Sequence, residues 1–316
     1  MPDAPRVAVI TAAYNAERFI DATIRSVRTQ TFPHFEYVIV DDNSTDATAD
    51  VIAAHVHQDS RVRMLRHSVN TGPGAARNRG VAATTAPFIS FIDSDDCWEP
   101  AFIRVMLAAL VRQAPHCVGV FCRSIVVDEH GTPTGMIQGP SDGSYRFFDF
   151  FRHIFPPGNG SAFLLHRRYF EESGGFSDLR SLEDLELYLR ILRSGKERHF
   201  ASVGHTLVRY RQSSTGLSAN GHHIASAWQS TMERYVESLP PHQRWIIYYN
   251  FSCFYGPRPC DTADLGTRLM RRALLSRKAP GEVFRHLGSM LLPATMGWKR
   301  YLALRRSLKR VGAFGR

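Results

Sequence analysis

The chain has 316 residues, of which 44% are hydrophobic and 22% are charged, and its formal net charge is +10 at pH 7. A chain of this length can bury a large core, and its composition is that of a globular protein, which excludes extended disorder. The first residues lack the basic start and apolar run of a secretory signal, and no stretch is apolar for long enough to span a bilayer. The five scattered cysteines have no metal-ligand spacing. These features predict a cytoplasmic protein with reduced thiols.

The positive charge is concentrated at the C-terminal end. Residues 265–316 contain 13 Lys and Arg residues and one acidic residue, a net charge of +12. The rest of the chain is therefore close to neutral. A basic segment of this kind predicts an anionic partner for that part of the chain.

Short runs of β-branched residues alternate with helical patterns over the first hundred residues. Strands are predicted at residues 6–13, 35–40, 61–66 and 88–92, and helices at residues 16–29, 46–57 and 73–84. Alternation at these lengths indicates a parallel sheet flanked by helices. In such a sheet, ligands bind at the carboxyl ends of the strands.

Polar residues follow each predicted strand. The segments are Tyr14-Asn15, Asp41-Asp42-Asn43-Ser44, Asn70 to Gly74, and Asp93-Ser94-Asp95-Asp96. Carboxylates repel each other when they are brought together, so this edge of the sheet needs a cation or hydrogen-bond donors. The alternative is that each residue is a turn or helix cap, a role that would suit Asn43 or Ser44 and Asn70.

Two of these segments suggest chemistry. Asp93 and Asp95, two residues apart at a strand end, could share a hard divalent ion such as Mg²⁺ or Mn²⁺ with a diphosphate. The segment NTGPGAARNRG at residues 70–80 allows close backbone approach and opens a helix at Pro73, with Arg77 one turn in. The helix N-terminus and Arg77 could both contact an anion, although a Pro-initiated, Ala-rich helix is the structural alternative.

The segments VITAAYN (9–15), VIVDDNSTD (38–46), NTGPGAARNRG (70–80), FIDSDD (91–96), GGF (174–176) and LEDLELYLR (182–190) occur in this order. In these motifs the chain resembles the family 2 glycosyltransferases over roughly residues 5–220. The resemblance implies the GT-A fold, an α/β fold with a Rossmann-like, mostly parallel central sheet flanked by helices. It also implies a nucleotide-diphosphate sugar donor, with UDP-sugars favoured, a Mn²⁺ or Mg²⁺ cofactor, and transfer with inversion.

The resemblance also implies roles for individual residues. Tyr14 would lie against the base, Asp42 would hydrogen-bond it, and Asp93 would hold the ribose. The nucleotide-sugar-binding residues would be Ala12, Tyr14, Asn15, Asp42, Asn70, Gly72, Arg77, Asp93 and Ser94. The metal would be held by Asp95, with Asp96 nearby as a second metal residue.

The Glu183-Asp184 pair would supply the catalytic base, and we assign this role to Asp184. Inversion requires one carboxylate to accept the proton of the acceptor hydroxyl. Glu183 could serve structure beside it. The alternative is that Ser181-x-x-Asp184 is a capping box that starts a helix bearing Leu185 and Leu189.

Two features depart from patterns known in the family. Ser213 stands where members often carry a His after a Tyr-Arg pair, and nearby His205 is expected to be structural. The Q-x-x-R-W motif of polymerising members is also missing, because Gln243-Arg244-Trp245 is too compact. We therefore expect an enzyme that adds a single sugar.

These observations predict a catalytic domain at residues 1–220, with a donor-binding half at about 1–100 and an acceptor-side half at about 101–220. A helical, basic region would follow at residues 221–316. The segment 284–310 mixes apolar and basic residues, which suits binding to an anionic membrane surface on the cytoplasmic side. A helix packed on the catalytic domain is the alternative, and no nucleic-acid partner is expected.

The predicted function is an inverting, metal-dependent transfer of one sugar to a hydroxyl of a glycan or lipid-linked acceptor. A nucleotidyltransferase acting on sugar phosphates is the first alternative, but it would leave Glu183 and Asp184 without a role. A degenerate nucleotide-sugar-binding module is the second. The presence of Asp93, Asp95 and Asp184 speaks against that reading.

Overall fold

A computed structural model describes residues 4–113, 115–152, 160–212, 221–240, 243–244, 246–248, 250–251, 268–269 and 272–273. The chain divides into two compact units, Met1–Ala219 and Asn220–Arg316. Within the described residues, no helix is both long and apolar enough to cross a lipid bilayer. The catalytic role predicted for residues 1–220, and its division into a donor-binding and an acceptor-side half, stay predictions.

The N-terminal part of the first unit is the predicted parallel sheet. Its strands lie in the order β3-β2-β1-β4 and all pair in parallel. They are β1 (Val7–Ala13), β2 (Phe35–Asp41), β3 (Val62–Arg66) and β4 (Phe88–Phe91), with helices α1 (Ile20–Arg28), α2 (Thr48–Gln58) and α3 (Pro73–Ala82). The sequence-based predictions of these seven elements are confirmed; α1 starts later and α3 ends earlier than expected.

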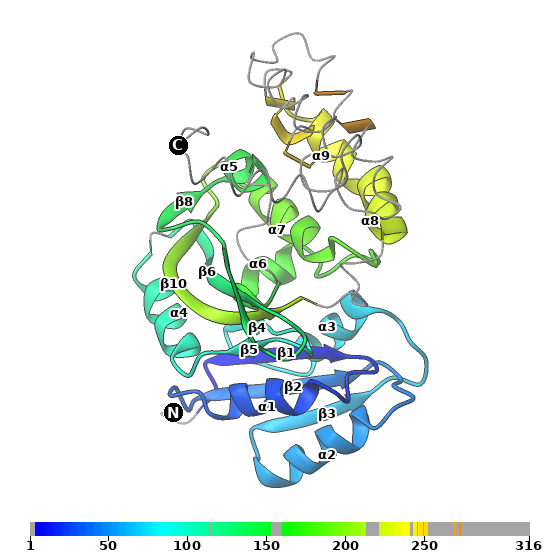
Figure 1. The fold of residues 1–316 in the computed structure, drawn as a ribbon. Coiled ribbons are helices and arrows are strands. Elements are labelled where there is room, and N and C mark those ends of the chain that lie inside the picture. The colour runs from blue at the N-terminus through cyan, green and yellow to red at the C-terminus, as the bar shows by residue number, and fades with distance from the viewer. Residues whose placement is uncertain are drawn as a thin grey trace. The chain divides into compact units, whose positions relative to one another are not determined.

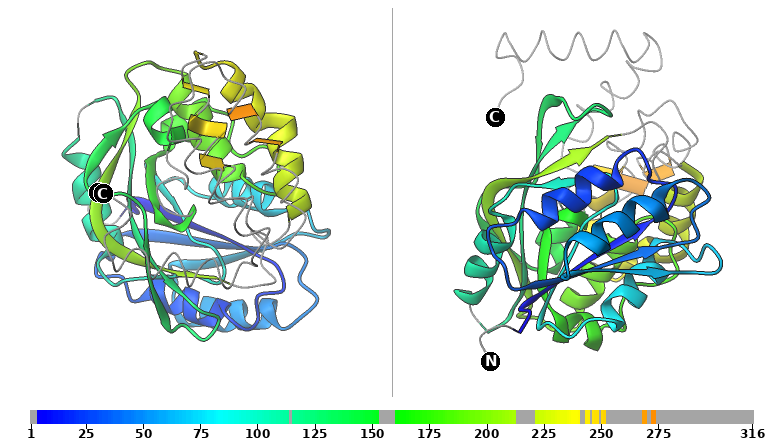
Figure 2. Two further views of the ribbon diagram at one scale, coloured as in Figure 1. Left: turned by 45° about the horizontal axis from the view of Figure 1, so that its top comes forward. Right: turned by 90° about the horizontal axis from the view of Figure 1, so that it is seen from below.

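Helices cover both faces of this sheet. α1 and α2 lie side by side on one face and α3 lies on the other (Figure 1), and the views in Figure 2 agree. α3 packs closely on β1 because Gly80 has no side chain: a Cβ there would lie 2.5 Å from the Cγ2 atom of Ile10. This packing brings the start of α3 to the carboxyl edge of the strands.

Beyond β4 the sheet becomes mixed, and its order continues β9-β6-β10-β5. β9 is antiparallel to both β4 and β6, whereas β10 is parallel to β6. The remaining elements are β5 (Cys97–Trp98), α4 (Phe102–Val111), β6 (Cys117–Val127), β7 (Pro133–Gln138), β8 (Gly143–Tyr145), α5 (Phe147–Arg152), η1 (Gly160–Ala162), β9 (Phe163–His166), α6 (Arg167–Glu172), α7 (Glu183–Arg193) and β10 (His199–Arg211). Parallel pairing therefore dominates only in the N-terminal part.

An aromatic cluster holds α7 against the mixed part of the sheet. Tyr188 of α7 stacks on Phe163 of β9 with a centroid distance of 4.2 Å, and Phe150 and Phe200 contact both rings edge-on or tilted. All four side chains are fully buried. The cluster fixes the helix whose first turn carries Glu183.

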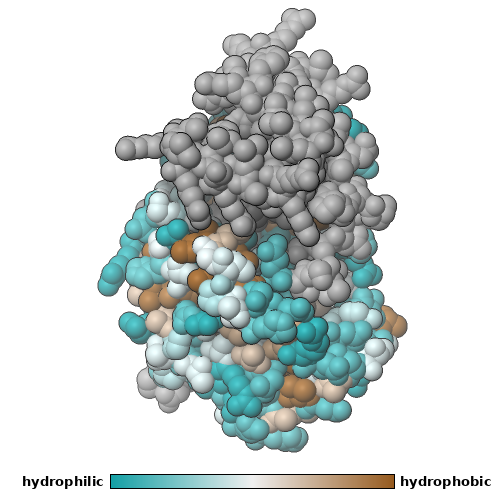
Figure 3. Space-filling view, viewed as in Figure 1, coloured by the Kyte–Doolittle hydropathy of each residue, from teal (hydrophilic) through white to brown (hydrophobic). Residues whose placement is uncertain are grey.

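The surface in Figure 3 is mostly hydrophilic where it is coloured.

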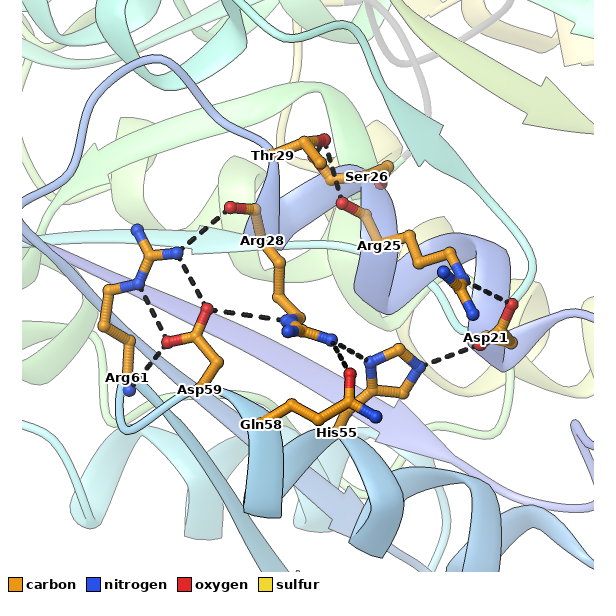
Figure 4. A network of polar contacts seen from close by, with 9 residues as sticks. All are labelled: Asp21, Arg25, Ser26, Arg28, Thr29, His55, Gln58, Asp59 and Arg61. Carbon is orange, nitrogen blue, oxygen red and sulfur yellow. Dashed lines mark hydrogen bonds and ion pairs between the residues drawn. The ribbon is translucent and has the colours of Figure 1, made fainter.

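A polar network joins α1 to α2 (Figure 4). Buried His55 lies between Arg28, whose Nη1 is 2.6 Å from Nδ1, and Asp21, whose Oδ1 is 2.9 Å from Nε2. A guanidinium can only donate and a carboxylate can only accept, so His55 accepts at Nδ1 and donates from Nε2. Asp59 pairs with Arg61 at 2.8 Å at the other end of the network.

The second unit is described only in part. α8 (Gly221–Ala227), the π-helical turn η3 (Trp228–Met232) and α9 (Glu233–Glu237) follow each other directly, and Trp228 packs on Phe251 at 4.4 Å. These elements are helical, as expected for this region. The predicted amphipathic segment 284–310 lies outside the described residues, as does most of the basic segment 265–316.

Candidate active site

Most of the predicted donor-binding and metal-binding residues gather at one edge of the sheet, because β2, β1 and β4 run parallel and end together. They lie at the ends of these strands or just before α3. They are Ala12, Tyr14 and Asn15 for β1, Asp42 for β2, Asn70 and Gly72 before α3, and Asp93, Ser94, Asp95 and Asp96 for β4. The side chain of Tyr14 is exposed, as a platform for a planar ligand would be.

The carboxylate of Asp42 holds the loop that precedes α3. It accepts hydrogen bonds from the backbone N–H groups of Thr71 (2.9 Å) and Gly72 (2.7 Å) and lies 2.7 Å from Nδ1 of His67. Burial alone would raise the pKa of Asp42, but these donors keep it below its ordinary value. Asp42 is thus ionised and shapes the loop, and the predicted contact with a base stays a prediction.

The N-cap roles considered for these strand ends are wrong. The N-cap of α2 is Ala47, which makes no side-chain cap. Asp46, the residue before it, accepts from the backbone N–H of Thr48 through Oδ1 at 3.0 Å. The hydroxyl of Ser44 instead accepts from the backbone N–H of Asn15 at 3.0 Å. Asn70 is not the N-cap of α3, which is Gly72 with φ of +91°. Asn70 instead accepts from Arg180 at 3.2 Å. The polar residues therefore join loops to each other.

Arg77 links the start of α3 to the acidic turn and to α7. Its guanidinium donates to Asp93 Oδ1 and to Glu183 Oε1, both at 2.7 Å, and its side chain is 10% exposed. Burial alone would lower the pKa of Arg77, but the two carboxylates raise it well above its ordinary value. In this structure Arg77 is thus a fixed cation between Asp93, the predicted ribose-binding residue, and Glu183, the neighbour of the predicted base.

The acidic turn after β4 separates its carboxylates into different environments. Asp96 is fully buried: Oδ2 accepts from the hydroxyl of Ser161 at 2.6 Å and Oδ1 from the backbone N–H of Arg211 at 2.8 Å. Burial and the charges of Asp95 and Asp93 raise the pKa of Asp96 well above its ordinary value. Both oxygens are engaged by protein donors, so this geometry favours a structural role over the predicted metal contact.

Asp95 is the more available of the two predicted metal ligands. Burial and the nearby charge of Asp93 raise the pKa of Asp95 to about 6. A divalent cation would relieve both effects, and oxygen ligands suit Mg²⁺ or Mn²⁺. Among the described residues, no group of three or more His, Cys, Asp or Glu side chains is arranged around a common metal position. Asp95 therefore fits an ion whose other ligands come from a diphosphate or water.

The capping-box interpretation of Ser181 and Asp184 is also wrong. The N-cap of α7 is Leu182, in a left-handed conformation with φ of +61°, and no side chain caps it. The hydroxyl of Ser181 is buried without a hydrogen-bond partner. Among the described residues, Asp184 Oδ1 accepts only from the backbone N–H of Leu185, at 2.7 Å. Asp184 is therefore not bound in a cap.

The environment of Asp184 suits a proton acceptor. Its partial burial and the charge of Glu183 raise the pKa of Asp184 to about 7. Gly160 lies in front of the carboxylate, because a Cβ built on Gly160 would be 3.4 Å from Asp184 Oδ2. A base whose pKa lies near the working pH is efficient in general-base catalysis.

Sequence reasoning missed three residues of the site. Ser161 donates to Asp96 and accepts from the backbone N–H of Asp93 at 3.0 Å, and His67 contacts Asp42. Arg211 donates from Nε to the carbonyl of Asp95 at 2.9 Å. Only Arg211 had a signal, the Tyr-Arg pair near the end of the resemblance.

Sequence comparison finds a family profile and relatives that match this chain. The sequence profile described as Glycosyl transferase family 2 matches residues 8–174, more than half of the chain. A Bacillus subtilis protein named as the teichuronic acid biosynthesis glycosyltransferase TuaG is 29% identical over 219 residues, which are 68% of this chain and 82% of that protein. The Escherichia coli protein WfaP, named as a UDP-Glc:alpha-D-GlcNAc-diphosphoundecaprenol beta-1,3-glucosyltransferase, is 39% identical over 92 residues, or 29% of this chain and 36% of that protein.

Solved structures show the same fold. Residues 1–349 of TarS from S. aureus, in complex with UDP, match with a TM-score of 0.59 at 18% identity, over 98% of this chain and 93% of that one. The mannosyltransferase PcManGT from Pyrobaculum calidifontis, in complex with GDP-Man and Mn²⁺, matches with a TM-score of 0.57 at 19% identity, over 95% and 83%. With the GT-A fold and the profile match in agreement, the chain belongs to glycosyl transferase family 2 and is an enzyme, a glycosyltransferase.

Proposed function

We propose that the chain is an inverting, metal-dependent glycosyltransferase in which Asp184 is the general base. The observation that carries the proposal is the contrast between two neighbouring carboxylates. Glu183 is paired with Arg77 at 2.7 Å, whereas Asp184 forms no ion pair with any Lys, Arg or His of the part of the chain that the structure describes, and its pKa is raised to about 7. Environments that differ in this way assign different roles to adjacent acids.

In the proposed reaction, Asp184 accepts the proton of an acceptor hydroxyl through its free Oδ2 atom. The acceptor oxygen forms a bond to the anomeric carbon of the donor sugar while the bond from that carbon to the diphosphate oxygen breaks. The nucleoside diphosphate leaves with the electron pair of the broken bond. Attack opposite the leaving group inverts the configuration at the anomeric carbon.

The other residues of the site would bind and orient the donor. Tyr14 would stack on the base, the loop shaped by Asp42 would border the nucleotide, and Asp93 would hold the ribose. Arg77 keeps Glu183 paired, and its positive charge favours an anionic ligand nearby. Asp95 would hold Mn²⁺ or Mg²⁺, which when bound neutralises charge on the departing diphosphate.

Donor and acceptor classes are proposed from the named relatives. TarS has been solved with UDP-GlcNAc and UDP, and PcManGT with GDP-Man, so a nucleoside diphosphate sugar is the expected donor, UDP first. WfaP is named for a lipid-linked acceptor, a glycan on diphosphoundecaprenol. We expect one sugar to be added to such an acceptor at the cytoplasmic face of a membrane, to which the basic segment 265–316 would bind.

The first test is thermal unfolding with UDP, GDP, dTDP and CDP, each with and without Mn²⁺. A ligand at 100 times its dissociation constant stabilises the folded state by about 2.7 kcal/mol. We expect one nucleotide to raise the unfolding midpoint in a Mn²⁺-dependent manner and its sugar conjugate to be hydrolysed to the nucleoside diphosphate. Release of pyrophosphate instead would identify a nucleotidyltransferase. Binding of a nucleotide sugar without turnover would identify a binding module.

The base assignment needs its own test. Asp184→Asn should bind the nucleotide with Mn²⁺ as the parent does and lose transfer and hydrolysis. Glu183→Gln is the matched neighbour, and it should lose stability as well as activity because Arg77 loses a charged partner. Full turnover by Asp184→Asn would refute the choice of Asp184.

A further inference from the structure

The GGF segment and Asn78 form a clasp that the proposed reaction does not yet use. Asn78 lies on α3, and its Nδ2 donates to the carbonyl of Phe176 at 2.9 Å. Its Oδ1 accepts from the backbone N–H of the same residue at 2.8 Å. One side chain thus satisfies both backbone groups of a residue 98 positions away.

Two glycines at the contact between α3 and the 174–177 turn, Gly74 and Gly175, have no room for a side chain. Gly175 has φ of +76°, and a Cβ there would lie 2.6 Å from Asn78 Oδ1. A Cβ on Gly74 would lie 2.8 Å from the carbonyl oxygen of Ser177. The close approach of α3 and the 174–177 turn therefore requires a glycine in each of the two segments.

The same turn is held by α7 from its other side. Arg190 donates to the carbonyl of Gly175 at 2.7 Å and also to the carbonyl of Ser173. Glu186 accepts from Arg190 at 2.8 Å and from the hydroxyl of Ser177 at 3.1 Å. The turn is thus joined by side chains of α3 on one side and of α7 on the other.

The clasped residue also contacts the site directly. The ring of Phe176 packs on Phe91 of β4 at 4.9 Å, and the guanidinium of Arg77 lies 5.3 Å from the centre of the Phe176 ring. Arg77 in turn holds Glu183, the first residue of α7, at 2.7 Å. A shift of Phe176 would therefore move Arg77 and the first turn of α7, which carries Asp184.

We propose that Asn78 is a positioning residue for the base: through Phe176 and Arg77 it sets the place of Asp184 relative to the donor-binding loop. This inference rests on the proposed function, in which Asp184 is the base. Misplacement of a reacting group by about 1 Å can lower the rate on the order of 100-fold. We expect a lower kcat rather than weaker nucleotide binding, because the side chain of Asn78 bonds to Phe176 and not to the residues predicted to bind the nucleotide base or the ribose.

The test compares Asn78→Asp and Asn78→Ala with Arg79→Gln. The Asp variant keeps the shape and the acceptor atom but loses the donor to the Phe176 carbonyl. Arg79 is the next residue of α3, and within the described residues its exposed side chain donates only to the carbonyl of Arg66, at 3.0 Å. Each variant is measured for unfolding midpoint, for UDP and GDP affinity with Mn²⁺, and for hydrolysis of UDP-glucose, UDP-N-acetylglucosamine and GDP-mannose across pH 5–9.

We expect both Asn78 variants to lose kcat by about 10-fold to 100-fold while nucleotide affinity stays within about 3-fold. The acidic limb of the pH profile should move to higher pH, because looser pairing of Arg77 leaves more negative charge beside Asp184. Arg79→Gln should match the parent. Parent-like kcat in folded Asn78 variants, or a loss of activity with an unchanged pH profile, would overturn the inference alone. A parent that hydrolyses none of the three donors and whose unfolding midpoint none of UDP, GDP, dTDP and CDP raises with Mn²⁺ would instead contradict the proposed function.

Discussion

Replacement of Arg77 by Met tests whether the site is held together by its buried cation. The side chain of Arg77 is 10% exposed and pairs at 2.7 Å with Asp93 and Glu183, which are 31% and 11% exposed. Removal of one partner from a buried pair costs about 3–5 kcal/mol, because the remaining charge stays buried. Since Asp93 is partly solvated, we expect a loss near the lower end, about 3 kcal/mol.

The assay is calorimetric unfolding of the full chain at neutral pH. For a unit of this size a loss of 1 kcal/mol lowers the midpoint by about 2–4 °C, so Arg77→Met should lower it by about 6–12 °C. Arg79→Met, an exposed neighbour on α3, should change the stability by less than about 0.5 kcal/mol. Adding Glu183→Met should recover part of the loss, since it removes one unpaired carboxylate. A midpoint within 2 °C of the parent would refute the view that Arg77 organises the site.

Four further outcomes follow from particular contacts. At pH above 7, Asp184→Asn should have a higher unfolding midpoint than the parent and no transfer activity. The pKa of Asp184 is raised to about 7 in the folded state, so its ionisation lowers the stability of the parent as pH rises from about 4 to 7. For the same reason the rate of the parent should fall as pH drops below about 7. Gly160→Ala, with its methyl group 3.4 Å from Asp184 Oδ2, should slow transfer to an acceptor more than hydrolysis by water, at an unchanged midpoint. His55→Ala should lower stability by about 1–3 kcal/mol without changing kcat, and nitrogen NMR of the parent should show a proton on Nε2 of His55, which faces Asp21.

The parallel part of the fold was predictable because its signals are local. β-branched runs give the strands, helical spacing gives the helices between them, and parallel order brings Asp42 and Asp93 to one edge. The antiparallel insertion of β9 between β4 and β6 was not predictable in this way. It pairs Ile89 with Leu165, and such long-range pairing leaves no periodic signal in either segment.

The same limit applies to single residues of the site. Sequence treats Asp95 and Asp96 alike, but Asp96 is withdrawn into the core by Ser161 and Arg211, which lie 65 and 115 positions away. The capping interpretation of Ser181 failed because Leu182 adopts a left-handed conformation at the start of α7. Tertiary packing sets the direction of the side chains beside such a residue, and a local sequence motif does not predict it.

The Glu183-Asp184 pair shows how one helical turn can serve structure and chemistry together. Successive residues of a helix point about 100° apart, so two adjacent carboxylates need not share an environment. One faces the buried guanidinium of Arg77 and the other faces the bare backbone of Gly160. The paired carboxylate raises the pKa of its neighbour by repulsion, and Arg77 limits that rise. The anchor of α7 therefore also adjusts the group that we assign as the base, and a change at either Arg77 or Glu183 should alter stability and pH dependence together.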